Sequence, residues 1–426
     1  MLHLLVIVLS SVSEEPGLAP SLDGGSISVG GVEAGDAGVP SRRVDGASIS
    51  IDGGADEPGD AGVPSRRFDI VPLPALGFDS QLGVIFGANV GLYWRAPHLQ
   101  PFEYAIAALA IFTTGGAHDH SLRFTAVDFL GSGLRPSVLV GYVRELYRNF
   151  YGIGNSVSVT MPGDPGWNPT FHSYTFDSLY GALDVERPFA THFVIGARYQ
   201  LRSLDTKLYE GSLLAAMRPN EAGLLRNGEL HLDLGYDSRD VEASPTRGLF
   251  LQAGVRFSHA ALASESSYVG AQLQLRGYWS LFGLGPRLVV AARLLFDVLA
   301  GDVPVALLPT FTGRTHYLDG VGGANSVRGL LRFKYVGKMK ALGNLELRSR
   351  LLRFLPFGRE FDIWAVGFVD VGRAWAEVAP EGGPFDFHPA FGGGLRFTFV
   401  TDFVLRVDYG SGEGNHAFAV VIENLF

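Results

Sequence analysis

From residue 68 onward, hydrophobic and polar residues alternate with a period of two, which is typical of β-strands with one apolar face. In the run 81–95 the apolar face carries Leu82, Val84, Phe86, Ala88, Val90, Leu92 and Trp94. The opposite positions are mostly glycine and asparagine. Runs 192–204, 228–238 and 267–282 repeat the pattern and keep charged residues off one face. Because a membrane barrel places lipid outside and polar groups inside, the pattern predicts transmembrane strands.

Sixteen runs along the chain have this strand-like character. They are 69–76, 81–95, 103–114, 120–131, 135–147, 171–186, 192–204, 228–238, 248–258, 267–282, 286–298, 341–354, 361–375, 389–400, 402–410 and 416–426. Single-chain bacterial barrels use an even number of strands. We therefore predict an all-β fold, an antiparallel transmembrane β-barrel of about sixteen strands over residues 68–426. The clearest uninterrupted apolar run, 104–112, is too short for a membrane-spanning helix, which needs ~18–20 residues.

The part of the chain before the barrel has a different composition. Residues 1–13 contain a short apolar run followed by serines, which is compatible with a secretory signal peptide, although no Lys or Arg precedes the run. Residues 14–67 are rich in Gly, Asp, Ser, Pro and Ala, a composition that predicts a disordered linker. A duplicated segment, 35–43 and 59–67, ends each time in paired arginines. A solvated linker explains this tract, and a periplasmic tether or processing site is the alternative.

Composition excludes several classes of site. The 426 residues include no cysteine, so neither disulfides nor thiolate metal sites are available. The net charge of −9, with scattered Lys and Arg, argues against nucleic-acid binding. We find no nucleophile elbow, zinc-binding helix or phosphate-binding loop, and predict no catalytic, cofactor or metal site. A barrel phospholipase would need Ser, His and Asp to converge, and no local signature supports this enzyme reading.

One glycine-rich stretch, 322–330, lies between two strand-like runs and contains a single arginine, Arg328. Glycines allow close backbone approach, and a guanidinium group can make several ionic contacts at once. Glu346 and Asp370 lie on the polar faces of the runs that follow. The pattern predicts that Arg328 enters the barrel and meets these carboxylates. The alternative is an exposed arginine in an ordinary loop.

The ordered set of motifs resembles the BamA/TamA-like outer-membrane assembly-factor superfamily, also called bacterial surface antigens. In that family a Val-Arg-Gly-aromatic motif at the tip of the sixth extracellular loop folds back into the barrel. The resemblance implies a loop plug formed by Val327, Arg328, Gly329 and Leu330. It also implies that Glu346 and Asp370 are the partners of the arginine. Leu330 departs from the usual aromatic residue, which is expected to weaken packing at the loop tip but not the ion pair.

Other segments carry the same resemblance. Residues 150–155 (Phe-Tyr-Gly-Ile-Gly-Asn) look like a family motif in a loop between early strands, and 236–248 looks like a mid-barrel turn. The last run ends on Phe426, similar to the terminal signal that the barrel-assembly machinery reads. Pro72 and Pro74 lack backbone N–H groups, so the first strand is expected to pair poorly with the strand that ends at Phe426.

The resemblance implies an integral protein of the bacterial outer membrane whose partners are the lipid bilayer, the barrel-assembly machinery and a protein or lipid client. Its expected role is insertion or translocation of proteins or lipids through a weak seam between the first and last strands. Family members that handle proteins usually carry POTRA domains, and none fits within residues 14–67. The alternative is a channel or pore gated by the sixth loop.

Several charged residues are predicted to face the lumen. They are Arg198, Arg202, His231, Asp233, Arg256, Arg276, Arg293, Arg348, Arg350, Arg396 and Arg406. These side chains either hold the wet wall in register through opposite charges or favour the passage of anions.

Overall fold

The structure is a computed structural model that describes residues 67–79, 83–96, 99–114, 116–160, 164, 168–241, 244–281, 287–312, 317–355, 361–379, 382–383, 385–399 and 403–422. The predicted signal peptide at 1–13, the linker up to residue 66 and Phe426 lie outside the described residues.

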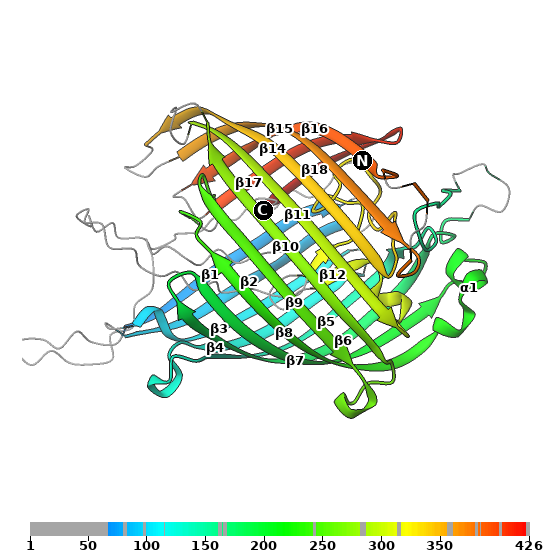
Figure 1. Ribbon diagram of the computed structural model, residues 1–426, viewed down its shortest axis with the longest axis horizontal. Helices are drawn as coiled ribbons and strands as arrows, with labels where there is room; N and C mark the ends of the chain where they lie inside the picture. Colours follow the sequence, from blue (N-terminus) through cyan, green and yellow to red (C-terminus); the bar gives the residue numbers. More distant parts are fainter. Residues whose placement is uncertain are drawn as a thin grey trace, which may run out of the picture.

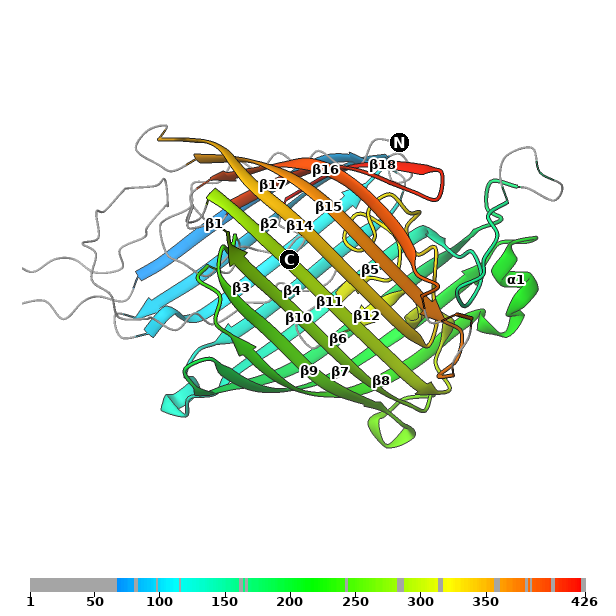
Figure 2. The same cartoon turned by 45° about the horizontal axis from the view of Figure 1, so that its top comes forward.

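The described chain forms one sixteen-stranded antiparallel sheet that is rolled into a barrel (Figures 1 and 2). Each strand pairs with the next strand of the sheet along the chain. Its strands are β1 (Arg67–Asp79), β2 (Gly83–Ala96), β3 (Leu99–Thr113), β4 (His118–Ala126), β5 (Arg135–Asn149), β6 (Ser173–Ala190), β7 (Phe193–Leu208), β8 (Gly223–Asp237), β9 (Gly248–Ser258), β10 (Tyr268–Ser280), β11 (Leu288–Gly301), β14 (Met339–Phe354), β15 (Phe361–Trp375), β16 (His388–Phe399), β17 (Phe403–Gly412) and β18 (Asn415–Ile422). The predicted barrel of about sixteen strands is confirmed.

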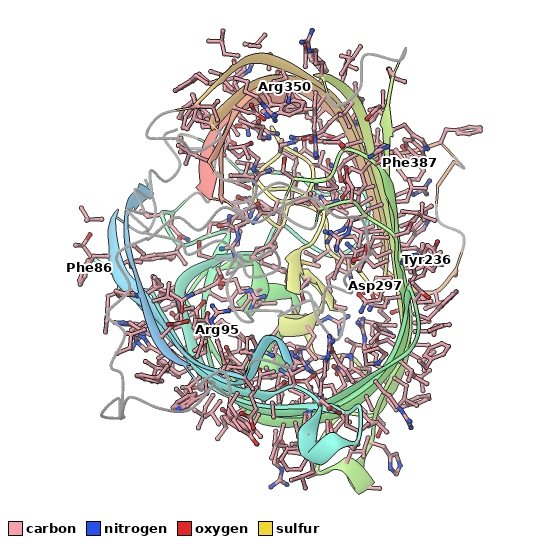
Figure 3. The ribbon with its side chains drawn as sticks, turned by 90° about the vertical axis from the view of Figure 1, so that its left-hand side faces the viewer. Phe86, Arg95, Tyr236, Asp297, Arg350 and Phe387 are labelled. Atoms are coloured by element: carbon pink, nitrogen blue, oxygen red, sulfur yellow. The ribbon has the colours of Figure 1, made fainter. Side chains whose placement is uncertain are left out.

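The two faces of the sheet differ as the alternation predicts. Phe86 and Val369 point outward and remain 46% and 50% exposed, whereas the side chains of Asp297 and Asp370 are fully buried. Figure 3 shows Phe86 on the outer surface and Asp297 on the inner side of the wall. Lipid therefore faces an apolar surface and the charged residues line the interior. Among the described residues, no helix has the length and apolar character needed to cross a membrane.

The largest difference from the predicted boundaries lies in the run 120–131. Strand β4 ends at Ala126, and a short 3-10 turn, η1 (Phe129–Gly131), follows. Asp128 and Leu130 adopt left-handed backbone angles there, and the Asp128 carboxylate accepts a hydrogen bond of 2.7 Å from the N–H of Gly133. This carboxylate closes a tight turn, so the apolar residues 129–130 belong to the turn and not to the strand.

The connection between β11 and β14, residues 302–338, is called the sixth loop here and is folded into the barrel. It contains a 3-10 turn, η5 (Val305–Leu307), and a short hairpin of β12 (Thr310–Thr312) and β13 (Tyr317–Asp319). Figure 3, a view along the barrel, shows this yellow segment inside the ring of strands. The remaining short elements are α1 (Leu213–Met217) and η2 (Pro219–Glu221) before β8, and η3 (Ala260–Leu262) before β10.

The main apolar clusters lie inside the barrel, where the sixth loop meets other loops and the inner wall. One joins Phe333 and Val336 of the sixth loop to Phe150 and Tyr174. The other joins Val327 and Leu330 to Leu342 on β14. These contacts bury apolar groups in an otherwise polar interior, so the sixth loop supplies a core that the sheet alone lacks.

Candidate functional site: the arginine of the sixth loop

The tip of the sixth loop passes so close to β17 that two glycines are required. Gly329 has a φ of +103°, and a Cβ atom there would lie 2.6 Å from the backbone nitrogen of Ser411. A Cβ atom on Gly410 would lie 2.7 Å from the carbonyl carbon and oxygen of Arg328. Because real Cβ atoms do not approach other atoms so closely, glycine in the loop tip and on β17 lets the two backbones touch. This approach delivers Arg328 to the inner wall.

The guanidinium group of Arg328 contacts three carboxylates from three strands. Its Nε and Nη2 donate to the two oxygens of Asp370 on β15 at 2.8 and 2.9 Å, which is a bidentate pair. Its Nη1 donates to Glu346 on β14 at 2.6 Å and to Asp408 on β17 at 3.1 Å. The backbone N–H of Arg328 also donates to Asp370, at 3.0 Å. All four side chains are at most 2% exposed.

An aromatic ring covers one face of the guanidinium group. The Cζ atom of Arg328 lies 3.4 Å from the ring centroid of Phe368. Phe368 and Asp370 are two residues apart on β15, so their side chains share the inner face of the barrel. The stacking fixes the plane of the guanidinium group and shields it from water.

Further arginines neutralise two of these carboxylates, Glu346 and Asp408. Arg396 contacts Asp408 at 2.5 Å and Glu346 at 3.0 Å, and Arg348 contacts Glu346 at 2.8 Å. Arg406 lies 3.5 Å from Asp408. Four arginines therefore surround three carboxylates, so each buried charge has at least one partner of opposite sign. A buried charge is stable only when it is paired in this way.

Side chains from the wall also bind the backbone of the loop tip. Asn344 donates to the carbonyl of Ser326 at 2.7 Å and to Asp370 at 2.7 Å. Arg293 donates to the carbonyl of Asn325 at 2.8 Å. Turns leave such carbonyls without ladder partners, and these contacts satisfy them. The loop tip is therefore held through its backbone as well as through Arg328.

Leu330 occupies the position where the related family carries an aromatic residue. Its side chain is 2% exposed and packs in the apolar cluster with Val327 and Leu342. A Cβ atom on Gly412 would lie 3.0 Å from a terminal carbon of Leu330, so the space beside it is filled. The tip is thus packed with a residue smaller than an aromatic ring.

A second set of contacts anchors the sixth loop at the turn between β17 and β18. Glu413, in the turn between β17 and β18, accepts hydrogen bonds from the Tyr335 hydroxyl at 2.9 Å and from Lys334. His388 also contacts Glu413 and stacks on the Tyr335 ring, with centroids 3.7 Å apart. Burial raises the pKa of the Glu413 carboxyl, but hydrogen bonds from Lys334 and Tyr335 and the positive charge of Lys334 outweigh burial and hold the pKa below its usual value. The acidic partner is therefore charged at neutral pH.

The structure brings Arg328, Glu346 and Asp370 together, and it adds partners that sequence reasoning missed. Asp408 is the third carboxylate, and it lies in the predicted run 402–410. Extending the inner-face rule to that run, where Arg406 was placed in the lumen, would have found it. The same rule places Asn344 on the inner face, two residues before Glu346. Glu413 carried no comparable signal, because its role depends on the path of the sixth loop.

Most of the predicted lumen arginines are paired as well. Arg198 binds Asp184 through two hydrogen bonds, and Arg202 lies 3.1 Å from Glu229. Asp297 pairs with Arg256 at 2.7 Å and with Lys340 at 2.9 Å. Across the described part of the chain, no group of three His, Asp or Glu side chains is arranged to hold a metal ion.

The first strand lies at one end of the sheet. Pro72 and Pro74 pair in register with Val90 and Ala88 of β2. The sheet runs from β1 to β18, and between the described residues of these two strands there is no ladder. Both ends of the sheet lie on the same side of the barrel in Figures 1 and 2, with β1 in blue and the last strands in red.

Comparisons with known proteins agree with this architecture. Residues 119–411 match the Omp85 superfamily domain. BamA from Haemophilus ducreyi lacking POTRA domains 1–3 has 14% identity and a TM-score of 0.54, over 84% of this chain and 69% of that chain. CdiB from Escherichia coli has 11% identity and the same TM-score of 0.54, over 84% of this chain and 61% of that chain. No curated protein sequence matches. The family match covers well over half of the sequence, and the chain therefore belongs to the Omp85 superfamily of non-enzymatic outer-membrane β-barrels.

Proposed function

We propose that this barrel assists the insertion or translocation of proteins or lipids at the outer membrane and that the junction of β1 and β18 is its lateral opening. The observation that carries the proposal is the missing ladder between the described residues of β1 and β18, in a sheet whose other neighbours are all paired. An unpaired strand edge is a template for another strand, so this junction is the place where a client could enter.

The two prolines support the same location. The ladder between β1 and β2 is continuous from Arg67 to Asp79. In an antiparallel ladder, alternate residues direct both backbone groups to the same neighbour. Since proline has no N–H, an unbroken ladder requires Pro72 and Pro74 to direct their backbone groups away from β2. Both prolines then reduce the number of donors that β1 offers to β18.

The interior supports lateral passage more than flow through the lumen. The sixth loop enters the barrel and is bound there through Arg328, Asn325 and Ser326. The arginine-rich wall was the reason to consider an anion channel gated by this loop. Because Arg198, Arg202, Arg256, Arg328 and Arg396 are each paired with a carboxylate, their charges bind the wall together and are not free to attract anions.

Cysteine pairs across the junction test the proposal, since the chain has no native cysteine. One cysteine is placed within 70–76 of β1 and one within 417–421 of β18, and pairs that oxidise are selected. The measured quantity is the rate at which an unfolded eight-stranded outer-membrane protein inserts into vesicles containing the purified barrel. Oxidation should stop the acceleration over empty vesicles, and reduction should restore it.

A matched control uses Leu345 and Val369, which are register partners on β14 and β15 and both face lipid. A disulfide there joins strands that are already paired, so it should leave the insertion rate unchanged. Insertion at the wild-type rate with an oxidised junction would rule out the lateral opening. Conductance in planar bilayers without any acceleration of insertion would favour the channel.

A further inference from the structure

We infer that Asn155, in the loop between β5 and β6, is a positioning residue that braces the sixth loop across the width of the barrel. This loop contains the segment 150–155, whose sequence resembles a family motif but whose role the arginine site does not explain. Two of its glycines, Gly152 and Gly154, have φ angles of +122° and +99°, so the chain turns sharply there. Phe150 is fully buried and Asn155 is 6% exposed, which places the segment inside the barrel.

The side-chain amide of Asn155 takes the place of a peptide group at the end of β15. The ladder between β15 and β16 ends where Gly372 pairs with His388. Two residues further along β15, the N–H of Ala374 donates to Oδ1 of Asn155 at 3.3 Å. Nδ2 of Asn155 donates to the carbonyl of Asp386 at 2.8 Å, just before β16 begins. The amide therefore bridges the gap that opens between β15 and the segment leading into β16.

Neighbouring residues of the same loop bind the sixth loop. The N–H of Gly154 in this loop donates to the carbonyl of Val336 at 2.7 Å, and the side chain of Asn149, the last residue of β5, donates to the carbonyl of Arg332 at 3.2 Å. Arg332 also lies 3.4 Å from Glu145 on β5. The end of the sixth loop is thus attached to the loop that Asn155 fixes in place.

The positions of the strands turn these contacts into a brace. In the order of the sheet, β5 is the fifth strand and β15 is the thirteenth, so they are eight positions apart in a sheet of sixteen strands. The two strands therefore lie on opposite walls of the barrel. The loop that starts at β5 reaches β15 through Asn155 and contacts the sixth loop on the way. Arg328 fixes the tip of the sixth loop, and the brace fixes residues 332–336.

The contribution of Asn155 follows from its burial. Removing the amide leaves the N–H of Ala374 and the carbonyl of Asp386 without this partner in a closed environment. A buried polar group that loses its partner destabilises the folded state. We expect this loss to release residues 332–336 of the sixth loop, while the pairs of Arg328 with Glu346 and Asp370 stay intact. The inference concerns the placement of the sixth loop and does not depend on the proposed lateral opening.

Limited proteolysis of the purified barrel in detergent tests the brace. Trypsin can cleave after Arg332 and Lys334 in the sixth loop, and after Arg247, which is exposed in the turn between β8 and β9 and is followed by Gly248. The readout is the cleavage rate at 332 and 334 divided by the rate at 247. For Asn155→Ala we expect this ratio to rise roughly tenfold, which corresponds to about 1.4 kcal/mol. The internal reference at Arg247 separates local release from general unfolding.

Two further variants complete the experiment. Asn155→Asp keeps the shape of the side chain and the acceptor for Ala374, but it loses the donor to Asp386, so the ratio should also rise. Asn168→Ala is the matched control. Asn168 lies in the same loop, and its side chain bonds to Thr170 and to Gly211 of the loop between β7 and β8. The ratio should then remain at the wild-type value. A wild-type ratio in both Asn155 variants would overturn the inference, as would an equal increase in the cleavage rate at Arg247.

Discussion

Arg328 shows how one planar side chain can organise three strands. The three carboxylates depend on Arg328 to different degrees. Glu346 also receives Arg348 and Arg396, and Asp408 also receives Arg396 and Arg406. Asp370, in contrast, binds Arg328 in the bidentate manner and receives a hydrogen bond from the neutral amide of Asn344. Asp370 should therefore be the carboxylate most affected by loss of the arginine.

This inequality leads to a ranking of variants. Arg328→Ala should lower the free energy of unfolding by about 3–5 kcal/mol, since it removes the cation that binds the buried Asp370 carboxylate through two hydrogen bonds. Asp370→Asn should come close to that loss, and Glu346→Gln should cost less. Arg328→Lys should keep only part of the wild-type stability. Lysine retains the charge but lacks the planar guanidinium group that makes the paired hydrogen bonds. The temperature at which the barrel unfolds on unboiled gels measures each effect. Wild-type behaviour of Arg328→Ala and Asp370→Asn would show that the loop tip is not held by this pair.

The contacts of Glu413 with the sixth loop predict a dependence on pH. The folded-state pKa of Glu413 lies below the model-compound value of 4.5, so the stabilising effect of its charge is present above pH 4.5. It is lost as the pH falls below 4.5 through the folded pKa. Trypsin does not work in that range, so pepsin digestion or amide hydrogen exchange of residues 332–336 is the suitable measurement. Exchange should accelerate on acidification in the wild type and should already be fast in Glu413→Gln, with little further change.

At this scale, the sequence was informative where a residue sits in a regular strand. Glu346 and Asp370 could be placed on the inner face from alternation, and resemblance directed Arg328 toward them. Asn155 and Glu413 could not be assigned partners, because each acts from a loop and its partners lie far away in the sequence. Asn155, for example, bonds to Ala374, 219 residues later. Alternation carries no information about such distant contacts.

Among the elements, the strands were predictable and the interior of the sixth loop was not. Lipid forces every wall strand to alternate, so the run 361–375 was predicted with the same bounds as β15. The hairpin of β12 and β13 has only three residues in each strand and is surrounded by protein. Nothing forces such short segments to alternate. The turn at 129–131 was missed because apolar residues continue beyond the end of β4.

The contact between the loop tip and β17 predicts a large effect of one methyl group. Gly410→Ala places a Cβ atom 2.7 Å from the carbonyl of Arg328, so one of the two backbones must move. We expect a loss of about 1–3 kcal/mol in the free energy of unfolding. Gly367→Ala is the matched control, since a Cβ atom there meets nothing within 4 Å. It should change stability by no more than about 0.5 kcal/mol. Equal stability of the two variants would contradict the close approach.

For the whole molecule, an even number of strands returns the chain to the face where it began. We expect the chain to enter the barrel from the periplasm, which would place the sixth loop and the loop between β7 and β8 outside the cell and the turn at Ser132 in the periplasm. A protease site inserted at Asn220 should be cleaved when protease is added to intact cells, whereas the same site at Ser132 should be protected. Cleavage at Ser132 with the outer membrane intact would contradict this orientation.

The barrel and its membrane location followed from alternation, because that pattern is a direct effect of the solvent on each side of the wall. Closure of the barrel could not be derived in the same way. The weak junction was inferred from Pro72 and Pro74, but the partner strand was predicted to end at Phe426, outside the described residues. Whether the two edges meet depends on registers summed around the whole ring, which no local pattern contains.

The partners of Arg328 also imply an order of assembly. Glu346, Asp370 and Asp408 follow the arginine by 18, 42 and 80 residues. All three therefore lie on strands that come after the sixth loop in the chain, and each new strand brings another carboxylate to the same cation. We expect the last quarter of the chain to form around the arginine before the early strands join it. In pulsed hydrogen exchange during refolding, protection would then appear in β14, β15 and β17 before β2 and β3. The sixth loop would in that case be the nucleus of the barrel, present before there is a lumen to enter.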